Sequence, residues 1–186
     1  ASSAVAMQAA KRLFLVGPMG AGKSTVGRHL ASLLGWQFVD SDHVIEERTG
    51  ADIPWIFEIE GENGFRDREQ KAIADLSTVD GMVLATGGGA VMREQNRAVL
   101  KEAGSVVYLR ATVREQVRRT GYNDKRPLLI GRNRHRVLRE LMQARDPLYR
   151  DVADLVVTTE GKNARKLAEE IICTLRERAL LPMVEQ

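Results

Sequence analysis

Residues 17–25, GPMGAGKST, bring glycines, a lysine and hydroxyl side chains together at a spacing that suits phosphate binding. The spacing is G-x-x-x-x-G-K-[ST], and it follows an apolar run that is typical of a buried strand. In such a loop the backbone N–H groups point at phosphate oxygens, the lysine reaches the terminal phosphates, and the hydroxyl binds Mg²⁺. The residues that this pattern assigns to nucleotide binding are Gly20, Ala21, Gly22, Lys23, Ser24 and Thr25.

Acidic side chains and glycines follow two further strand-like runs, as Asp-Ser-Asp at 40–42 and Gly-Gly-Gly at 87–89. Ligands of open parallel sheets bind beyond the carboxyl ends of the strands, so we expect both segments to meet the phosphate loop. One aspartate could steady Mg²⁺ through water, and the other could take the proton of an acceptor hydroxyl. Asp40 or Asp42 could also cap the next helix, which does not exclude a functional role.

Two arginines stand in motifs far apart in the chain, Arg66 in GENGFRDRE and Arg145 in RDPLY. We expect Arg66 near the start of a helix and Arg145 at the end of one. A guanidinium group presents a planar fork that suits a carboxylate or a phosphate. If both reach the cleft, they indicate an anionic acceptor. The alternative is that each is a solvated surface charge.

Residues 121–136 are the least core-like stretch of the chain, with arginines at 126, 132, 134 and 136 and few apolar residues. This composition indicates an exposed, mobile segment. It is either a solvated loop or a lid that closes over a polyphosphate, and the lid is the more specific hypothesis.

The elements that must position these residues alternate between strands and helices. We predict strands at 13–16, 37–39, 82–85, 106–109 and 155–157, and helices at about 24–34, 65–77, 93–103, 112–119, 134–144 and 163–178. This alternation is typical of βαβ units around a parallel sheet. The sequence therefore predicts an α/β fold, with a five-stranded parallel sheet flanked by helices, in one domain over residues 1–186. No repeat or interdomain linker is found in it.

Composition limits the possible functions. The 186-residue chain has a net charge of only +3 and 5% aromatic residues, which argues against nucleic acid as a partner. The single cysteine, Cys173, excludes an internal disulfide and a cysteine metal cluster. We expect Cys173 on a helix, with its side chain in the protein core. No apolar run is long enough to span a membrane. Residues 1–11 lack the pattern of a secretory signal and suggest a frayed arm, so we expect a cytoplasmic protein.

As an ordered set, the motifs resemble those of the shikimate kinase family, over about residues 12–175. The shared motifs are GPMGAGKST at 17–25, DSD at 40–42, GENGFRDRE at 61–69, ATGGGAV at 85–91, RPLL at 126–129 and RDPLY at 145–149. The resemblance implies a P-loop kinase fold with a lid. It also implies transfer of the ATP γ-phosphoryl group to the 3-hydroxyl of shikimate, on the route to chorismate and the aromatic amino acids.

The resemblance also implies roles for matched residues on the acceptor side. Asp42 would bind the ring hydroxyls of shikimate and accept the proton. Arg66 and Arg145 would pair with its carboxylate, and Gly88 would offer a backbone N–H.

On the nucleotide side, the resemblance implies that Ser24 and Asp40 serve Mg²⁺ and that Lys23 acts on the terminal phosphates of ATP. Arg126 would be the lid arginine that reaches the transferring phosphate. Lys162 would lie near the edge of the adenine. The catalytic residues would thus be Asp42, Lys23 and Arg126, in a protein that we expect to be a monomer.

Three other functions remain possible from the sequence. A metabolite kinase of the gluconate kinase type would share the loop and the sheet, although the FRDRE and GGG segments speak against it. A nucleoside monophosphate kinase is disfavoured by the pairing of DSD with GGG. A nucleotide-dependent switch without chemistry would bind nucleotide but release no ADP in response to an acceptor, and the N-K-x-D motif of GTPases is missing from the chain.

Overall fold

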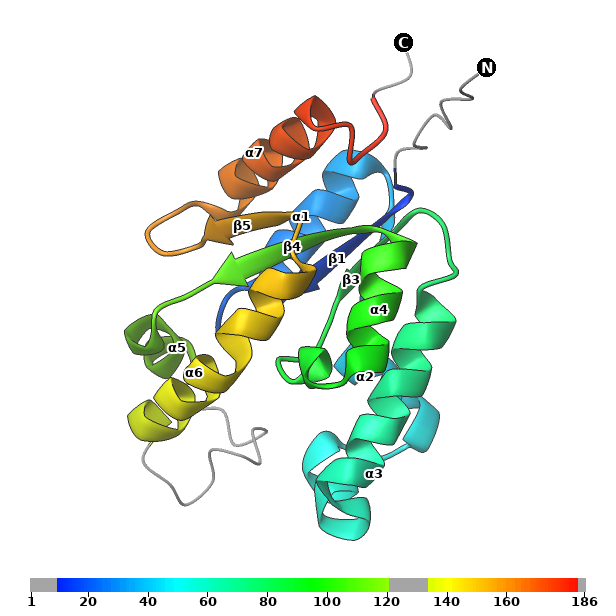
Figure 1. Ribbon diagram of the computed structural model, residues 1–186, viewed down its shortest axis with the longest axis vertical. Helices are drawn as coiled ribbons and strands as arrows, with labels where there is room; N and C mark the ends of the chain where they lie inside the picture. The colour runs from blue at the N-terminus through cyan, green and yellow to red at the C-terminus, as the bar shows by residue number, and fades with distance from the viewer. Residues whose placement is uncertain (1–9, 121–133, 184–186) are drawn as a thin grey trace.

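The computed structural model describes residues 10–120 and 134–183 of the chain. Five parallel strands form one sheet in the order β2-β3-β1-β4-β5 (Figure 1). The predicted α/β fold with a five-stranded parallel sheet is therefore confirmed. The strands are β1 (Arg12–Val16), β2 (Gln37–Asp40), β3 (Met82–Ala85), β4 (Ser105–Arg110) and β5 (Leu155–Thr158).

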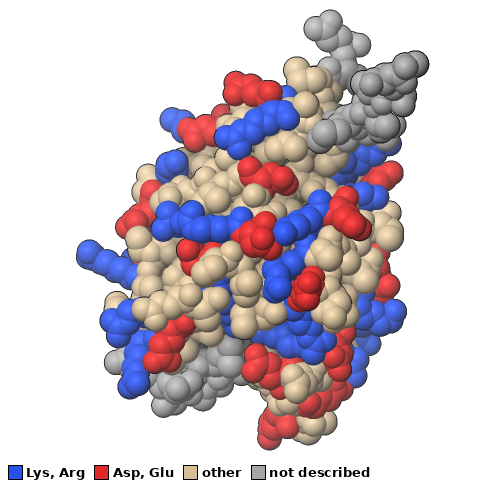
Figure 2. Space-filling model, viewed as in Figure 1, with Lys and Arg blue, Asp and Glu red and all other residues tan. Residues whose placement is uncertain are grey.

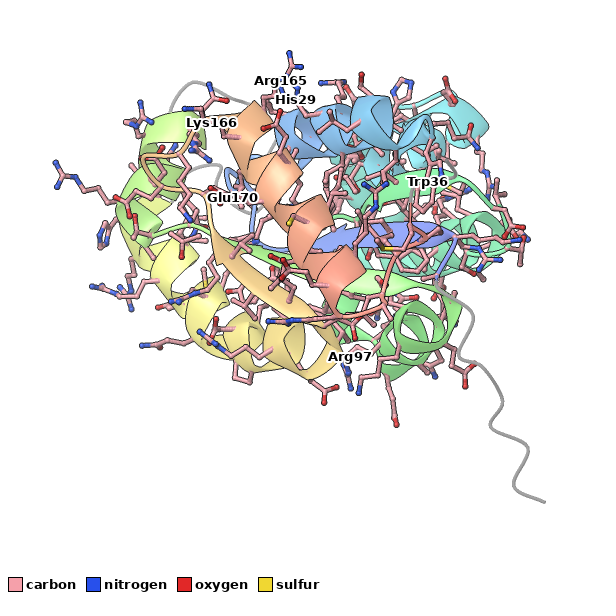
Figure 3. The ribbon with its side chains drawn as sticks, turned by 90° about the horizontal axis from the view of Figure 1, so that it is seen from above. His29, Trp36, Arg97, Arg165, Lys166 and Glu170 are labelled. Carbon is pink, nitrogen blue, oxygen red and sulfur yellow. The ribbon has the colours of Figure 1, made fainter. Side chains whose placement is uncertain are left out.

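Helices cover both faces of the sheet. The described helices are α1 (Lys23–Leu34), α2 (Ser41–Thr49), α3 (Ile53–Leu76), α4 (Glu94–Ala103), α5 (Val113–Thr120), α6 (Arg134–Val152) and α7 (Ala164–Glu177), with a short 3₁₀ helix, η1 (Ala90–Met92). Figure 3 shows the sheet between two helical layers, with the labelled Trp36 on the side of α1 and α7 and Arg97 on the side of α4 and α6.

Strand β1 illustrates how the core is built. Leu13 and Leu15 pack in the cluster that includes residues of α1 and α7, whereas Phe14 and Val16 pack in the cluster that includes residues of α4 and α6. All four side chains are fully buried. Alternate side chains therefore supply opposite cores, as expected of a central parallel strand, and the sheet is a rigid base for the loops that leave its carboxyl edge.

The strand register brings three loops together at that edge. Leu15 of β1 pairs with Ala85 of β3, and Ala85 pairs on its other side with Asp40 of β2. The Thr86 hydroxyl and N–H both donate to the Leu15 carbonyl oxygen, at 2.9 and 3.0 Å. The phosphate loop, the Asp-Ser-Asp segment and the glycine loop at 87–89 consequently leave neighbouring strands side by side.

Two helices differ from the prediction in their bounds, and α2 was not predicted. Helix α3 begins at Ile53 instead of about 65, because Asp52 caps its N-terminus by accepting from Trp55 N at 3.0 Å. Gly61 has φ 72° and kinks α3, which hides its periodicity in the sequence. Helix α6 continues through Pro147 to Val152, so Arg145 lies inside the helix, and its predicted place at a helix end is wrong.

Cys173 lies on the exposed side of α7, so its predicted place in the core is wrong. Helix α7 buries Ile171, Ile172 and Leu175, and this apolar stripe faces α1. Cys173 lies outside the stripe, within 3.6 Å of a Glu177 carboxylate oxygen.

Some predictions concern residues outside the described ranges. Most of the proposed lid, residues 121–133 with Arg126, lies outside the described ranges. The last three residues of the predicted segment, 134–136, form the first turn of α6. The proposed N-terminal arm also lies outside the described residues over positions 1–9. Among the described helices, none is both long and apolar enough to cross a membrane.

Charged side chains of both signs alternate over the face shown in Figure 2, and acidic side chains gather at its lower end, over α3. This mixed surface agrees with the small net charge of +3.

Candidate active site

The phosphate loop depends on glycine at its first position and at its end. Gly17 has φ 144°, and a Cβ atom there would lie 2.3 Å from the Leu109 carbonyl oxygen. Gly22 has φ 85° and stands immediately before α1. Other side chains rarely adopt such backbone angles, so both glycines are required by the shape of the loop. The N-terminus of α1 therefore opens onto the concave side of the loop, where it favours an anion.

The Lys23 ammonium group lies over its own loop. It donates to the carbonyl oxygens of Gly17 and Pro18 at 2.7 and 2.8 Å. A cation held at this point is next to the place where the terminal phosphates of a nucleotide would lie.

Ser24 and Asp40 form a pair of oxygen donors beside the loop. The Ser24 hydroxyl donates to Asp40 Oδ2 at 3.3 Å, and Asp40 Oδ1 accepts from Asp42 N at 2.9 Å. Asp40 therefore caps α2 and also faces the phosphate loop. Within the described ranges, no group of three or more His, Cys, Asp or Glu residues could hold a metal. The pair fits Mg²⁺, which takes few protein oxygens and completes its octahedron with phosphates and water.

The glycine loop at 87–89 lies among charged side chains of α2 and α3. A Cβ atom on Gly87 would lie 2.7 Å from Glu69 Oε2 and 2.8 Å from Asp42 Oδ1. A Cβ atom on Gly89 would lie 2.3 Å from Arg66 Nη2. Only glycine leaves room for these groups, so the loop lets both carboxylates and one guanidinium group approach its backbone closely.

Gly88 is the point where the glycine loop meets the phosphate loop and α6. A Cβ atom on Gly88 would lie 3.4 Å from Met19 N and 3.5 Å from Arg145 Nη1. Asp42, Arg66, Gly88 and Arg145 are therefore gathered around one loop, next to the phosphate loop. The structure brings these four predicted acceptor-site residues together.

Both arginines are buried, with 8% of Arg66 and 5% of Arg145 exposed. Arg66 Nη1 donates to Glu69 Oε1 at 2.8 Å. Arg145 Nε is buried, and no residue in the described ranges accepts a hydrogen bond from it. A buried guanidinium group with spare donors favours an anionic partner. Burial also raises the pKa of the Glu69 carboxyl, against the opposing effect of the Arg66 charge.

The sequence did not reveal the role of Glu69, Tyr149 or Arg119. Glu69 follows Arg66 by one helical turn, and Tyr149 follows Arg145 by one turn, so helical spacing was the available signal. The Tyr149 hydroxyl donates to the Gly88 carbonyl oxygen at 2.5 Å.

Arg119 has no such signal, because it stands in an arginine-rich helix end. Its Nη1 donates to the Gly20 carbonyl oxygen at 2.9 Å, and its Nε pairs with Glu115 at 2.8 Å. Arg119 therefore lies against the phosphate loop.

Lys162 lies in the exposed turn after β5, which is separated from β1 by β4. This turn is at the carboxyl edge of the sheet, but no described contact joins Lys162 to the phosphate loop. Its predicted place near adenine remains a prediction, as does the role of Arg126.

A phosphate loop after the first strand of a parallel sheet, with a separate acceptor site beside it, defines a P-loop kinase. The model of the family described as shikimate kinase matches residues 19–176. The chain belongs to the shikimate kinase family.

The relatives agree with this assignment. A shikimate kinase of Pseudomonas entomophila is 58% identical over 167 residues, which cover 90% of this chain and 97% of the relative. The solved structure of a shikimate kinase from Acinetobacter baumannii, in complex with shikimate, has a TM-score of 0.89 and 51% identity, and the match covers 93% of this chain and 97% of that one. A gluconokinase from Sinorhizobium meliloti has a TM-score of 0.56 at 14% identity, over 92% of this chain and 94% of its own, and shares only the fold.

Proposed function

We propose that this chain is a phosphotransferase that moves the γ-phosphoryl group of ATP to the 3-hydroxyl of shikimate. The products are shikimate 3-phosphate and ADP, on the route to chorismate and the aromatic amino acids. One observation supports this most directly. Two buried arginines from α3 and α6 lie against the same glycine loop as Asp42, beside the phosphate loop. An acceptor that carries both a carboxylate and a hydroxyl matches this arrangement.

On the acceptor side, Arg66 and Arg145 bind the carboxylate through charge-assisted hydrogen bonds. The Gly88 N–H donates to an oxygen of the ring substituents. Asp42 accepts a hydrogen bond from the reacting hydroxyl and takes its proton as the hydroxyl oxygen bonds to the γ-phosphorus. The bond between this phosphorus and the β,γ-bridging oxygen breaks, and ADP leaves.

On the nucleotide side, Lys23 neutralises charge on the terminal phosphates, and the loop from Gly20 to Thr25 holds them through backbone N–H groups. Ser24 and Asp40 would hold Mg²⁺, which neutralises and orients the phosphates when it is bound. Phosphoryl transfer has a loose transition state, so correct placement and neutralisation of charge supply most of the catalysis.

The lid completes this proposal. Arg126 contacts the phosphoryl group in transit, and closure over the nucleotide keeps water from competing as the acceptor. Lys162 lies near the adenine edge. We further propose that the enzyme is a cytoplasmic monomer that acts on small molecules and needs no nucleic acid or membrane.

The test is a coupled assay of ADP release with ATP and Mg²⁺, in the presence of shikimate, of gluconate, or of neither. Of the three conditions, we expect ADP release only when shikimate is present. We expect EDTA to abolish this release. Release with gluconate would instead indicate the gluconate kinase reaction. Equal release without any acceptor would indicate an ATPase, and nucleotide binding without release would indicate a switch. Each of these outcomes contradicts the proposal.

A further inference from the structure

Tyr149 links two groups of the proposed acceptor site. Its side chain is 1% exposed, and its hydroxyl donates to the Gly88 carbonyl oxygen at 2.5 Å. The Arg145 guanidinium group approaches the same hydroxyl oxygen from one turn earlier in α6. Burial raises the pKa of Tyr149 to about 12, so the hydroxyl keeps its proton and remains a donor at neutral pH.

The carbonyl oxygens of all three loop glycines accept hydrogen bonds, but from different sources. Gly87 O accepts from Ala90 N at 3.0 Å, and Gly89 O accepts from Met92 N at 3.1 Å, both within the turn that leads through η1. Gly88 O accepts from Tyr149, which belongs to another element. The carbonyl group in the middle of the loop is therefore fixed by a hydrogen bond from α6, whereas the other two are fixed by hydrogen bonds within the same turn.

A held carbonyl group fixes more than its own direction. A peptide unit is planar, so the hydrogen bond to Gly88 O also sets the direction of the Gly89 N–H. Hydrogen bonds at Gly87 O and Gly88 O hold the peptide units on both sides of the Gly88 Cα, where a glycine would otherwise rotate freely. The peptide units that carry the Gly88 and Gly89 N–H groups are thereby fixed before a ligand arrives.

We propose that Tyr149 is a positioning residue, whose hydroxyl holds the Gly88 peptide so that the loop N–H groups and the Arg145 guanidinium group meet the acceptor together. This inference rests on the proposed function, because it takes the acceptor to be shikimate. The group that Tyr149 holds is the backbone of the glycine loop, and its hydroxyl donates to that loop rather than to the phosphate loop.

Tyr108 provides a matched control. Its ring lies 4.8 Å from the Tyr149 ring between centroids, at an angle of 36°, and its side chain is equally buried. Its hydroxyl donates to Asp146 Oδ1 at 2.7 Å and does not reach the glycine loop. The two tyrosines thus differ in what their hydroxyl groups hold, while their rings are in contact within the same buried cluster.

The experiment compares Tyr149→Phe with Tyr108→Phe in the coupled assay, together with thermal unfolding. We expect Tyr149→Phe to raise the KM for shikimate about threefold to tenfold, as for one lost hydrogen bond, with kcat and the KM for ATP within twofold of the parent. We expect Tyr108→Phe to leave all three constants unchanged, although both variants lower the melting temperature to a similar extent.

A second pair of variants separates the hydrogen bond from the fold. Replacing Tyr149 with 4-aminophenylalanine keeps a donor at the same place, and replacing it with 4-methylphenylalanine keeps only the volume. We expect the amino variant to restore the KM for shikimate and the methyl variant to leave it raised.

Two results would overturn the inference while the proposed function stands. One is a parent-like KM for shikimate in both Tyr149→Phe and the methyl variant. The other is an equal rise in Tyr108→Phe. If the parent protein releases no ADP in response to shikimate, the proposed function itself fails, whatever the variants do.

Discussion

Arg66 and Arg145 are the residues on which the choice of an anionic acceptor depends most. A charge-assisted hydrogen bond contributes about 1.5–3 kcal/mol. We therefore expect Arg145→Ala and Arg66→Ala each to weaken shikimate binding by about tenfold to a hundredfold, while the KM for ATP changes little. The measurement is steady-state kinetics with each substrate varied in turn.

The double variant and an altered ligand serve as controls for this prediction. The combined loss should be smaller than the sum of the two single losses, because the residues share one ligand. Shikimate with a neutral amide in place of its carboxylate should bind poorly to the parent and lose little more in either variant. An amide that binds as well as the acid would rule out a carboxylate clamp.

Glu69 should make the stability of the protein depend on pH in a definite direction. Its pKa in the folded protein is raised above the ordinary 4.5 by burial, so the folded state binds the proton more tightly than the unfolded state does. The stabilisation from that proton is fully present below about pH 4.5 and is lost as the pH rises through the folded pKa.

Urea unfolding of the parent and of Glu69→Gln between pH 4 and pH 7 checks this sign. Glutamine cannot ionise, so the free energy of unfolding of the parent, relative to the variant, should decrease as the pH rises. Carboxylates elsewhere titrate in both proteins and cancel in the difference. A difference that is constant or grows with pH would show that the Glu69 pKa is not raised.

Residues of the candidate site were predictable where they directly follow a strand. Asp42 and Gly88 could be placed together because the ends of parallel strands meet at one edge. Glu69 and Tyr149 carried only the signal of helical spacing, which does not tell which way a helix face turns. The place of Arg119 depends on how α5 packs against the phosphate loop.

At the scale of the element, the phosphate loop should tolerate no side chain at Gly17. A Cβ atom there meets the Leu109 carbonyl oxygen at 2.3 Å, and φ is 144°. Gly35, at the end of α1, has φ 68° but nothing within 4 Å of its Cβ position, so it isolates the cost of the backbone angle alone. We expect Gly35→Ala to cost about 1–2 kcal/mol and Gly17→Ala at least about 3 kcal/mol, with weakened ATP binding.

Chemical unfolding of the two variants measures the losses of stability, and nucleotide titration measures ATP binding. Gly35→Ala should bind ATP as the parent does. Equal losses of stability in the two variants would mean that β4 does not press on the loop.

The lid makes a kinetic prediction. A lid arginine that contacts the phosphoryl group in transit acts mainly in the transition state. Arg126→Ala should therefore lower kcat much more than it raises the KM for shikimate, in the same steady-state assay. A change confined to the KM for shikimate would assign Arg126 to the acceptor site instead.

The elements differ in how far the sequence predicts them. The strand bounds are correct to within one residue at each end, because their apolar runs are short and continuous. Helix α3 was recognised only after its kink, since Gly61 divides the periodic pattern. Helix α6 was ended too early, because Pro147 normally stops a helix, whereas here the buried Tyr149 and Val152 hold the next turn against the sheet.

At the scale of the whole molecule, the exposed Cys173 allows a simple test of whether the outer side of α7 contributes to activity. It is the single cysteine of the chain, and it stands on the solvent side of α7. Cys173→Ala should change the stability by no more than about 0.5 kcal/mol and should keep full activity. A thiol reagent should modify the folded parent without loss of turnover, and Cys173→Ala should take up none. A thiol that reacts only after unfolding, or a loss of turnover on modification, would contradict this.

The first and last described segments lie together, at the end of the sheet opposite to the phosphate loop (Figure 1). Ala10 and Leu180 line one shared hollow there. A linker that joined the fold at Ala10 or Leu180 would therefore start at the end of the sheet opposite to the phosphate loop. The protein could be anchored to a sensor surface, or joined to a second enzyme, in an orientation that turns the phosphate loop away from the attachment. Because Ala10 and Leu180 lie close together, joining the chain at these points and reopening it in an exposed turn is also a practical route to a permuted enzyme.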